Sequence, residues 1–410
     1  MKYGLIGQRL GHSFSKEIHE QIGKYEYELK ELDANEFISF MEKKDFKAIN
    51  VTIPYKEKVL PYLHYISEEA KRIGAVNVIV NKDGLLYGYN TDYLGLKEMI
   101  NHFNIDLNNK NVLILGTGGT SKTSYNVAKD LNANKVSFVS SSKKDNALSY
   151  EDLDKYANDY QILINTTPKE MYPNNYESIV SLDSFNNLEG VIDVIFNPLR
   201  TSLILKAKKK NIKCCSGLFM LVAQAFYAIE IFLETKLDKQ IIIDVYNNLI
   251  NQKENIVLIG MPSCGKTTIG KHLSKKINKT LIDIDEEIEK EINMKIKDFF
   301  KEHSENEFRE IETKVIKEIA KKQNLIIATG GGAILKKENV DALKQNGKLF
   351  FLDRNLKKLK YTSSRPLSSS IDALKNLYKT RYPIYKDVCD VRIDANCKIN
   401  DVVNKILGGK

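Results

Sequence analysis

Short apolar segments rich in β-branched residues alternate along this chain with longer segments in which apolar residues recur at helical spacing. Short buried runs predict strands, and strands that alternate with amphipathic helices are typical of βαβ units and parallel sheets. The pattern therefore predicts an α/β protein. The strands that we expect are residues 2–6, 25–32, 48–53, 77–80, 111–115, 135–140, 161–165, 191–196, 255–259 and 281–285.

The pattern restarts at two places, and the restarts divide the chain into three blocks. Residues 1–104 form the first block, and the turn Gly116-Thr117-Gly118-Gly119 lies in the second, 105–216. Residues 217–250 contain two helical segments that we expect to pack back on the first block. A polar stretch, 247–255, predicts a linker before the third block, 256–410.

Composition narrows the class of protein. The length of 410 residues suits two or three domains. The net charge of +9 is spread along the chain, which favours solvated helix faces over a nucleic-acid site and suits small anionic ligands. Five cysteines without a CxxC pair are typical of a reducing cytoplasm, and neither a leader nor a membrane-spanning stretch is expected. We therefore expect a cytoplasmic protein with small-molecule ligands and no nucleic-acid or membrane partner, and homo-oligomerisation stays open.

The second block carries a glycine-rich turn between a strand and a helix. Gly116, Gly118 and Gly119 allow backbone N–H groups and the helix dipole to approach a pyrophosphate. About twenty residues further on, an NAD-binding protein carries an acidic residue. The residues found there are Ser140, Ser141, Ser142 and Lys143. Hydroxyl and ammonium groups favour the 2′-phosphate of NADP(H), with NAD(H) as the alternative.

The third block opens with a strand and a phosphate-binding loop, residues 260–267, of the pattern GxxxxGK[ST]. The glycines of such a loop let backbone N–H groups curl around phosphates, Lys266 reaches the outer phosphates, and the Thr267 hydroxyl binds Mg²⁺. The residues that we expect to contact the nucleotide are Gly260, Ser263, Gly265, Lys266, Thr267 and Thr268.

A pair of aspartates ends the next predicted strand. Asp283 and Asp285 stand at alternate positions, so both carboxylates should lie on one side of the strand. Phosphoryl transfer needs a metal that bridges the phosphates and a positioned hydroxyl group. We therefore expect Asp283 near Mg²⁺ and Asp285 near the acceptor hydroxyl.

Seven motifs of the first two blocks resemble, in family order, those of shikimate dehydrogenases. They are HSxSxxIH at 12–19, NVTIPYK at 50–56, GAVN at 74–77, NTD at 90–92, GTGG at 116–119, NTTP at 165–168 and GxxMLxxQ at 217–224. The resemblance covers essentially residues 1–250. It implies a two-lobed dehydrogenase with a Rossmann-like NADP lobe.

The resemblance assigns Lys56 and Asp92 as the catalytic pair. Reduction of a ketone develops an alkoxide, which Lys56 can stabilise and protonate, while Asp92 would orient the same hydroxyl and favour the charged form of Lys56. Considered alone, Lys56 could instead be an ordinary charged surface residue. The polar residues near the starts of helices could instead be helix caps. The residues implied to bind the substrate carboxylate and ring hydroxyls are Ser13, Ser15, Thr52, Asn77 and Gln224.

The chain departs from the dehydrogenase family at several positions. Lys16 stands where Pro is common, Tyr93 where Gly is common, and Phe196 where a substrate-contacting Tyr is common. Residues 140–142 replace an Asn-Arg-Thr sequence, which leaves the cofactor preference open. None of these departures removes the catalytic pair.

Five motifs of the third block resemble those of shikimate kinases. They are DxD at 283–285, EFRxIE at 307–312, TGGG at 329–332, SRPL at 364–367 and RxPxY at 381–385. The groups implied to bind the shikimate carboxylate are Arg309, Arg381, Gly331 and Gly332. For Arg309 the alternative is an ion pair with Glu305 or Glu312 on one helix face, and for the glycines a strand-ending turn.

The same resemblance implies roles in phosphoryl transfer. Asp285 would hold the ring hydroxyls and orient or deprotonate the one that is attacked. Arg365 would sit on a lid and reach the transferring phosphoryl group opposite Lys266. The implied fold is a P-loop kinase domain with a parallel sheet flanked by helices.

Together the two resemblances imply a bifunctional enzyme of the shikimate pathway, towards chorismate and the aromatic amino acids. It would reduce 3-dehydroshikimate to shikimate with NADPH, and then phosphorylate shikimate to shikimate 3-phosphate with ATP and Mg²⁺. Two alternatives remain. One is an NAD-using quinate/shikimate dehydrogenase joined to the kinase, and the other is a chain in which one part senses a ligand without catalysis.

Overall fold

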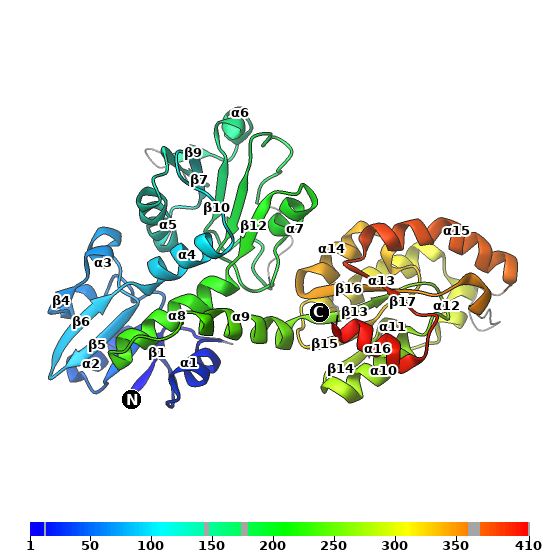
Figure 1. Ribbon diagram of the computed structural model, residues 1–410, viewed down its shortest axis with the longest axis horizontal. Coiled ribbons are helices and arrows are strands. Elements are labelled where there is room, and N and C mark those ends of the chain that lie inside the picture. The colour runs from blue at the N-terminus through cyan, green and yellow to red at the C-terminus, as the bar shows by residue number, and fades with distance from the viewer. Residues whose placement is uncertain (12–13, 143–146, 174–178, 360–369, 409–410) are drawn as a thin grey trace. The chain divides into compact units, whose positions relative to one another are not determined.

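The computed structural model describes residues 1–11, 14–142, 147–173, 179–359 and 370–408. The chain divides into two compact units, Met1–Asn248 and Leu249–Lys410. The first unit is built on two sheets and the second on one (Figure 1). The α/β class predicted from the sequence pattern is confirmed. Among the described residues, no helix combines the length and the apolar character that crossing a membrane requires.

The first lobe of the first unit contains a six-stranded sheet in the order β2-β1-β3-β5-β6-β4. Its strands are β1 (Tyr3–Gly7), β2 (Glu28–Glu31), β3 (Ala48–Val51), β4 (Tyr65–Ile66), β5 (Val78–Lys82) and β6 (Leu85–Tyr89). The helical elements are α1 (Ser15–Gly23), α2 (Ala34–Lys43), η1 (Leu60–Tyr62), α3 (Glu68–Ile73) and α4 (Thr91–His102).

This first sheet is mixed, so the prediction of parallel sheets is wrong for this lobe. Strands β1, β2 and β3 are parallel, whereas β5 runs antiparallel to both β3 and β6. For β5 and β6 the physical reason is the two-residue turn Asp83-Gly84, where φ angles of 50° and 84° allow a direct hairpin connection. The Gly84 N–H donates to Asn81 Oδ1 at 2.8 Å, which fixes the turn.

The second lobe contains a parallel six-stranded sheet in the order β12-β11-β10-β7-β8-β9. Strands β7, β10 and β11 are almost wholly buried, as is usual for parallel strands between two layers of helices. The strands are β7 (Asn111–Leu115), β8 (Lys135–Ser140), β9 (Ala147–Ser149), β10 (Ile162–Asn165), β11 (Gly190–Asp193) and β12 (Lys213–Ser216). The helical elements are α5 (Gly119–Asp130), α6 (Leu153–Tyr156), η2 (Ala157–Asp159) and α7 (Ser202–Lys209).

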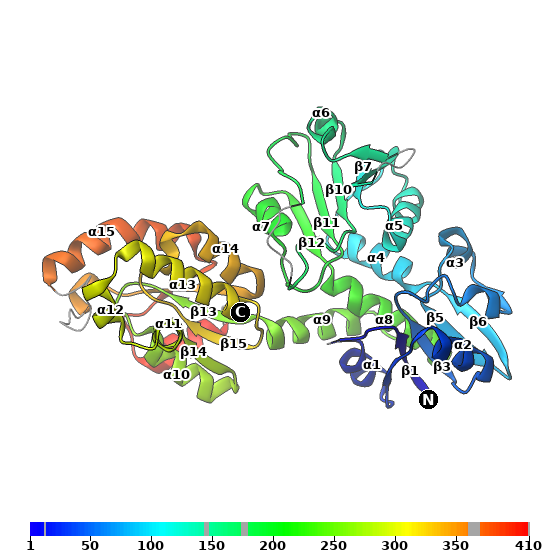
Figure 2. The same cartoon turned by 180° about the vertical axis from the view of Figure 1, so that it is seen from behind.

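Residues 217–250 contain helix α8 (Leu218–Leu233) and most of helix α9 (Gln240–Lys253). Helix α8 packs on α1, α4, β3 and β5 of the first lobe (Figures 1 and 2). The predicted linker, 247–255, is helical as far as Lys253. The helix continues because Ile242, Val245 and Leu249 recur at helical spacing and are buried, while the polar residues of the stretch can occupy its exposed side.

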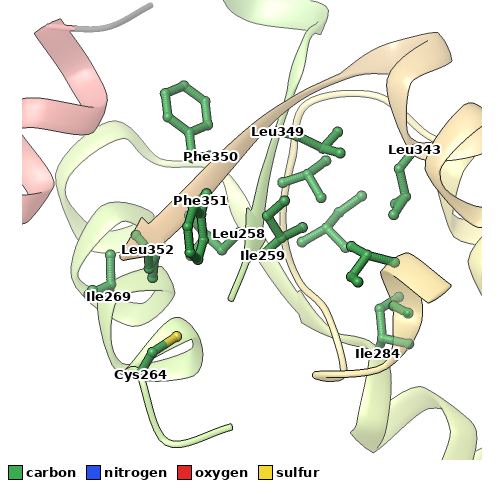
Figure 3. Packing of buried hydrophobic residues seen from close by; sticks show 14 of the residues in the cluster. Leu258, Ile259, Cys264, Ile269, Ile284, Leu343, Leu349, Phe350, Phe351 and Leu352 are labelled. Carbon is green, nitrogen blue, oxygen red and sulfur yellow. The ribbon is translucent and has the colours of Figure 1, made fainter. Parts of the chain in front are cut away.

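The second unit contains a parallel five-stranded sheet in the order β14-β15-β13-β16-β17. Its core gathers around the two central strands, where Leu258 and Ile259 pack near Leu349, Phe351 and other apolar side chains (Figure 3). The strands are β13 (Asn255–Ile259), β14 (Thr280–Asp283), β15 (Leu325–Ala328), β16 (Gly347–Asp353) and β17 (Val391–Asp394). The helical elements are α10 (Lys266–Ile277), α11 (Ile284–Ile292), α12 (Ile296–Glu302), α13 (Glu305–Ala320), η3 (Ala333–Leu335), α14 (Lys337–Asn346), η4 (Leu356–Lys358), α15 (Ile371–Val388) and α16 (Ile399–Gly408).

Candidate active sites

A cavity of about 330 Å³ in the first unit is lined by residues of both lobes. The first lobe contributes residues that follow β1 and β3 or begin α4, and the second contributes residues that begin α5 or follow β11. Carboxyl ends of strands are where ligands bind in open α/β sheets. Six predicted site residues line the cavity, namely Ser15, Thr52, Lys56, Asn77, Asp92 and Gln224.

Lys56 and Asp92 form an ion pair in this cavity, with 2.6 Å between Nζ and Oδ2. Their side chains are 29% and 18% exposed, so both are partly shielded from solvent. Lys56 follows β3, and its carbonyl oxygen accepts from the Val76 N–H at 2.9 Å. Asp92 lies in the first turn of α4, which the Asn90 side chain caps by accepting from the Tyr93 N–H. An ammonium group paired in this way can stabilise and protonate an alkoxide.

Asn77 holds the start of α4 beside the cavity. Its Oδ1 accepts from the Thr91 N–H at 2.7 Å, and its Nδ2 donates to Thr91 Oγ1 at 3.1 Å. Asn50, a cavity residue without a predicted role, is 5% exposed and accepts at 2.7 Å from the Tyr27 hydroxyl. Its place inside the NVTIPYK motif was the signal that could have identified it.

Three other predicted substrate residues reach the cavity from separate elements. Ser15 begins α1, Thr52 follows β3, and Gln224 lies in α8. The Gln224 Nε2 donates to the Leu221 carbonyl at 2.9 Å, and both residues line the cavity. Ser13 lies outside the described residues.

Phe14 and Phe196 bring aromatic carbon to the cavity from the two lobes. Both residues line it, and their ring centroids lie 5.7 Å apart. Phe196 stands where the dehydrogenase family often has Tyr, so this position offers no hydroxyl to a ligand.

The glycine-rich turn of the second lobe joins β7 to α5. Gly116 has a φ of 102°, and an added Cβ would lie 3.0 Å from Thr166 Oγ1, so the position requires glycine. Gly118 is the N-cap of α5, and a Cβ added to Gly118 or Gly119 would meet no atom within 4 Å. Open space before the N-terminus of this helix suits a diphosphate group.

The serines expected near the cofactor lie at the end of β8, the strand next to β7, where Ser140 is the last strand residue and Ser141 and Ser142 follow it. The Oγ atoms of Ser140 and Ser142 lie 3.1 Å apart, and Ser140 Oγ accepts from the Ser142 N–H at 3.2 Å. Ser141 and Ser142 are exposed. Lys143 lies outside the described residues.

A second cavity, of about 590 Å³, lies in the second unit. It is bounded by the P-loop, the segment after β14, helix α13, the segment after β15, and α15. The predicted site residues that line it are Ser263, Gly265, Lys266, Thr267, Thr268, Asp283, Asp285, Arg309, Gly331, Gly332 and Arg381. Gly260 begins the loop, and Arg365 lies outside the described residues.

The P-loop has the backbone that its glycines predict. Gly260, Ser263 and Gly265 have φ angles of 147°, 63° and 103°, which turn successive N–H groups inward. The Lys266 ammonium group donates to the carbonyl oxygens of Gly260 at 2.8 Å and Met261 at 3.1 Å. The Lys266 ammonium group is therefore held by backbone oxygens of the same loop.

Thr267 and Asp283 bring two oxygens together at the end of the P-loop. The Thr267 hydroxyl donates to Asp283 Oδ2 at 2.6 Å. Hard oxygen ligands of this kind, completed by phosphates and water, fit Mg²⁺. The two residues are therefore suited to hold the metal that the sequence predicts.

The aspartate pair is not arranged as predicted. Strand β14 ends at Asp283, and Asp285 is the second residue of α11, so the two are not alternate positions of one strand. The reason is capping, because Asp283 Oδ1 accepts from the Asp285 N–H at 3.1 Å and starts the helix. Both residues still line the same cavity.

Arg309 takes part in both arrangements that the sequence left open. Its guanidinium pairs with Glu305 and Glu312, each at 2.8 Å, and it also lines the cavity. A Cβ added to Gly332 would lie 2.4 Å from Arg309 Nη2, so the absence of a side chain there allows the close approach.

Helix α15 brings a second arginine to the same cavity. Arg381 is 5% exposed, and burial lowers its pKa. One turn further on, the Tyr385 hydroxyl donates to the Gly331 carbonyl at 2.6 Å, which ties the helix to the glycine segment. Two guanidinium groups, those of Arg309 and Arg381, suit the binding of a carboxylate.

Glu312, which was predicted only as a possible ion-pair partner of Arg309, also lines the cavity. It is 1% exposed, burial raises its pKa although Arg309 opposes the rise, and its Oε1 has no hydrogen-bond partner among the described residues. A Cβ added to Gly330 would lie 2.7 Å from Asp285 Oδ1 and 3.0 Å from Glu312 Oε1. Both carboxylates therefore face the glycine segment.

Comparison with known proteins decides which family the first unit represents. A family model for the shikimate dehydrogenase substrate binding domain matches residues 5–79. A shikimate dehydrogenase (NADP(+)) of Clostridium beijerinckii is 38% identical over 267 residues, which are 61% of this chain and 98% of that protein. The chain belongs to the shikimate dehydrogenase family. Its relative of the same name from Methanococcus maripaludis is 34% identical, with 92% of its length covered.

Solved structures agree with the dehydrogenase fold. Shikimate dehydrogenase 1 of Peptoclostridium difficile is 38% identical, with a TM-score of 0.56 over 61% of this chain and 98% of that one. A chorismate mutase/shikimate 5-dehydrogenase fusion protein of Clostridium acetobutylicum is 32% identical, with a TM-score of 0.58 over 61% and 97% of the two chains. The predicted two-lobed fold is confirmed.

The second unit matches a different family model, that of shikimate kinase, over residues 262–408. The match begins inside the P-loop and runs through α16. Both resemblances predicted from the sequence are therefore confirmed, and one chain carries a dehydrogenase unit and a kinase unit.

Proposed function

We propose that this chain is a bifunctional enzyme of the shikimate pathway, which reduces 3-dehydroshikimate to shikimate with NADPH and then phosphorylates shikimate with ATP. The observation that carries the proposal is that each unit gathers the groups its reaction needs around one cavity. The family matches support the same two reactions. Module order along the chain follows reaction order, since the product of the first unit is the acceptor of the second.

In the dehydrogenase unit, bound NADPH supplies a hydride to the ketone carbon. Lys56 stabilises the oxygen on which charge develops and donates the proton that completes the hydroxyl. Asp92, at 2.6 Å from Lys56, orients the ammonium group and the same hydroxyl. The residues that bind the carboxylate and the ring hydroxyls are Ser13, Ser15, Thr52, Asn77 and Gln224.

NADP(H) is the proposed cofactor of the second lobe. Gly116, Gly118 and Gly119 leave room for a diphosphate at the start of α5. The residues proposed for the 2′-phosphate are Ser140, Ser141, Ser142 and Lys143, among which no acidic residue stands. The NADP(+) in the names of the curated relatives supports the same preference.

In the kinase unit, bound Mg²⁺ would supply positive charge to the phosphates of ATP. Thr267 and Asp283 offer it oxygen ligands, and Lys266 exchanges its contacts with backbone oxygens for the outer phosphates. Asp285 accepts the proton of the attacking 3-hydroxyl as the γ-phosphoryl group moves to that oxygen and ADP leaves. The remaining proposed contacts are Arg309, Arg381, Gly331 and Gly332 to the carboxylate, Gly260, Ser263, Gly265 and Thr268 to the nucleotide, and Arg365 to the phosphoryl group.

The decisive experiment incubates the pure full-length chain with 3-dehydroshikimate, NADPH, ATP and Mg²⁺. We expect shikimate 3-phosphate to accumulate, shikimate to accumulate when ATP is omitted, and neither product to form without NADPH. Formation of shikimate alone in the complete mixture would contradict the kinase function. Phosphorylation of added shikimate without reduction of 3-dehydroshikimate would contradict the dehydrogenase function.

The competing interpretation of the first unit is an NAD-using quinate/shikimate dehydrogenase. Steady-state comparison of NADPH with NADH, and of shikimate with quinate, separates the two. We expect higher kcat/KM for NADPH and for shikimate, and equal or better turnover of quinate would overturn this substrate assignment. A cytoplasmic location, the absence of nucleic-acid and membrane partners, and the oligomeric state stay predictions from the sequence.

A further inference from the structure

Arg354 is an arginine beside the P-loop for which neither the sequence motifs nor the proposed reaction gives a role. It directly follows β16, which pairs with the P-loop strand β13. Its Nη1 lies 3.5 Å from the Cys264 carbonyl oxygen, and a Cβ added to Gly265 would lie 3.7 Å from the same nitrogen. The guanidinium therefore lies against the phosphate-binding loop.

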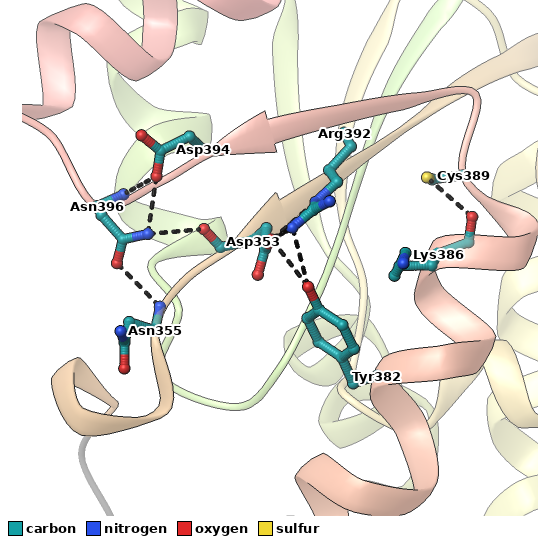
Figure 4. A network of polar contacts seen from close by, with 8 residues as sticks. All are labelled: Asp353, Asn355, Tyr382, Lys386, Cys389, Arg392, Asp394 and Asn396. Atoms are coloured by element: carbon teal, nitrogen blue, oxygen red, sulfur yellow. Dashed lines mark hydrogen bonds and ion pairs between the residues drawn. The ribbon is translucent and has the colours of Figure 1, made fainter.

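The nearest acid along the chain does not neutralise this arginine. Asp353 Oδ2 accepts from Arg392 Nε at 2.8 Å and from the Tyr382 hydroxyl at 3.1 Å (Figure 4). Successive side chains at the end of a strand leave on opposite sides, which separates Asp353 from Arg354. No carboxylate among the described residues pairs with Arg354, and its buried Nε has no hydrogen-bond partner there. Its charge and one donor are thus available for an anion.

The strand order indicates which ligand this arginine faces. Strands β14 and β15, which precede the acceptor residues Asp285 and Gly330–Gly332, lie on one side of β13, and β16 and β17 lie on the other. Ligands of open α/β sheets lie beyond the carboxyl ends of the strands. Arg354 therefore borders the nucleotide side of the P-loop, away from the acceptor.

The backbone around Arg354 is fixed by contacts between the segments that follow β16 and β17. The Asn355 N–H donates to Asn396 Oδ1 at 2.9 Å, and the Asn396 Nδ2 donates to Asp394 Oδ1 at 2.7 Å (Figure 4). The Lys358 Nζ donates to the Asn396 carbonyl at 3.0 Å. These hydrogen bonds therefore hold the backbone next to Arg354 in place.

We propose that Arg354 is a further nucleotide-binding residue of the kinase unit, whose guanidinium pairs with the phosphate chain of ATP. The proposal rests on the proposed kinase function. A planar guanidinium can bind phosphate oxygens in two parallel bonds, which a lysine cannot do. The P-loop would then be flanked by two cations, Lys266 from within and Arg354 from the neighbouring strand.

The test measures binding of ADP and of inorganic tripolyphosphate to the full chain and to Arg354→Gln. Loss of one charge-assisted contact should weaken both ligands by about 10- to 100-fold. In steady state, KM for ATP should rise similarly, while KM for shikimate stays unchanged. Arg392→Gln, which removes the other arginine of this edge, is the matched control and should bind both ligands as the parent does. Cooperative thermal unfolding of the kinase unit, measured by calorimetry, reports that this unit is folded in each variant.

Each outcome decides the proposal. Unchanged affinity of Arg354→Gln for ADP overturns it, and so does weakened binding of ADP with unchanged binding of tripolyphosphate, which would indicate a contact with the nucleoside. If Arg354→Gln loses the cooperative unfolding of the kinase unit, Arg354→Lys decides, because retained charge should preserve part of the phosphate affinity. Failure of the parent chain to bind ADP would instead contradict the proposed kinase function itself.

Discussion

At the scale of single residues, the ion pair of Lys56 and Asp92 leads to a prediction about dehydrogenase activity. Lys56→Met removes the proposed acid and its charge while keeping an apolar chain of similar length. We expect dehydrogenase kcat to fall by about 10²- to 10⁴-fold, because proton transfer by a positioned group contributes that much. The matched control is Lys58→Met, an exposed lysine two residues on, which should keep parental activity.

The second unit provides an internal control for that experiment. Kinase activity of Lys56→Met should equal that of the parent chain, since Lys56 lies in the first unit. Dehydrogenase activity within threefold of the parent would show that the role given to Lys56 is wrong.

The substitution Gly332→Ala tests the proposed binding of the shikimate carboxylate by Arg309. The methyl group of Gly332→Ala would lie 2.4 Å from Arg309 Nη2, so the guanidinium must move away from the cavity. We expect KM for shikimate to rise by about 10-fold, as for loss of one charged contact, with KM for ATP unchanged. Gly408→Ala, where an added Cβ meets nothing within 4 Å, is the control. An unchanged KM for shikimate would argue against the role of Arg309.

The sequence identified most of the polar residues that line the two cavities, because its motifs indicate which polar groups follow which strands. The sequence alone could not decide whether Arg309 forms an ion pair or binds a ligand. In the structure its guanidinium pairs with Glu312 and also lines the cavity. The burial of Glu312 was not predicted, because a glutamate at helical spacing resembles a solvated surface residue and only three-dimensional packing buries it.

At the scale of elements, Asp193 anchors the segment that follows β11 and leads to Phe196. Burial raises the pKa of Asp193 to about 7, against hydrogen bonds from Thr201, Ile195 and Asn165. Its folded-state pKa thus lies above its ordinary value of about 3.9. This group therefore contributes stability at acidic pH, and the contribution is lost as the pH rises towards 7.

Asp193→Asn removes that titration. The difference in unfolding free energy between variant and parent should shift in favour of the variant as the pH rises from about 5 to 8, by at most about 1.4 kcal/mol per pH unit up to the folded-state pKa. Urea titrations of the dehydrogenase unit at both pH values measure this shift. A difference that does not depend on pH would contradict the raised pKa.

Helices α4 and α5 are tied across the two lobes by a tyrosine at a position where the family often has Gly. The Tyr93 hydroxyl donates to Asp130 Oδ2 at 2.5 Å, and Arg72 donates to both oxygens of Asp130. Tyr93→Phe should lower the unfolding free energy of the dehydrogenase unit by about 1 kcal/mol, the usual contribution of one hydrogen bond. Tyr125→Phe, an exposed tyrosine of the same unit, should change it by less than about 0.5 kcal/mol.

Elements with strong local patterns were predictable, and those that depend on partners were not. Strands β7 and β10 agree with the predicted ranges to within one residue, because their apolar runs are buried in a parallel sheet. Strand β6 was missed although Asp83-Gly84 is a hairpin signal, since the expectation of parallel strands left no place for it. The last turns of α9 were missed because their polar residues resemble a linker.

At the scale of the whole molecule, each unit has a separate apolar core. One core cluster gathers residues of 256–406, and others lie wholly within the first unit. Units with separate cores unfold as separate transitions. A ligand stabilises only the unit that binds it, by about 2.7 kcal/mol at a hundredfold excess over Kd.

We therefore expect calorimetry of the full chain to resolve two transitions. NADP⁺ should raise the midpoint of one, and ADP with Mg²⁺ should raise the midpoint of the other. Chelation of Mg²⁺ should abolish kinase activity and leave reduction of 3-dehydroshikimate unchanged. A single transition raised by both ligands would show that the units unfold together.

The helix that carries the chain across the unit boundary, α9, also has a consequence for the cell. Every ribosome that completes the chain makes one copy of each site, so transcription and translation cannot alter the stoichiometry of the two activities. Flux from the reduction to the phosphorylation can then be balanced only through turnover numbers and substrate supply. Selection on either unit therefore acts on the abundance of both.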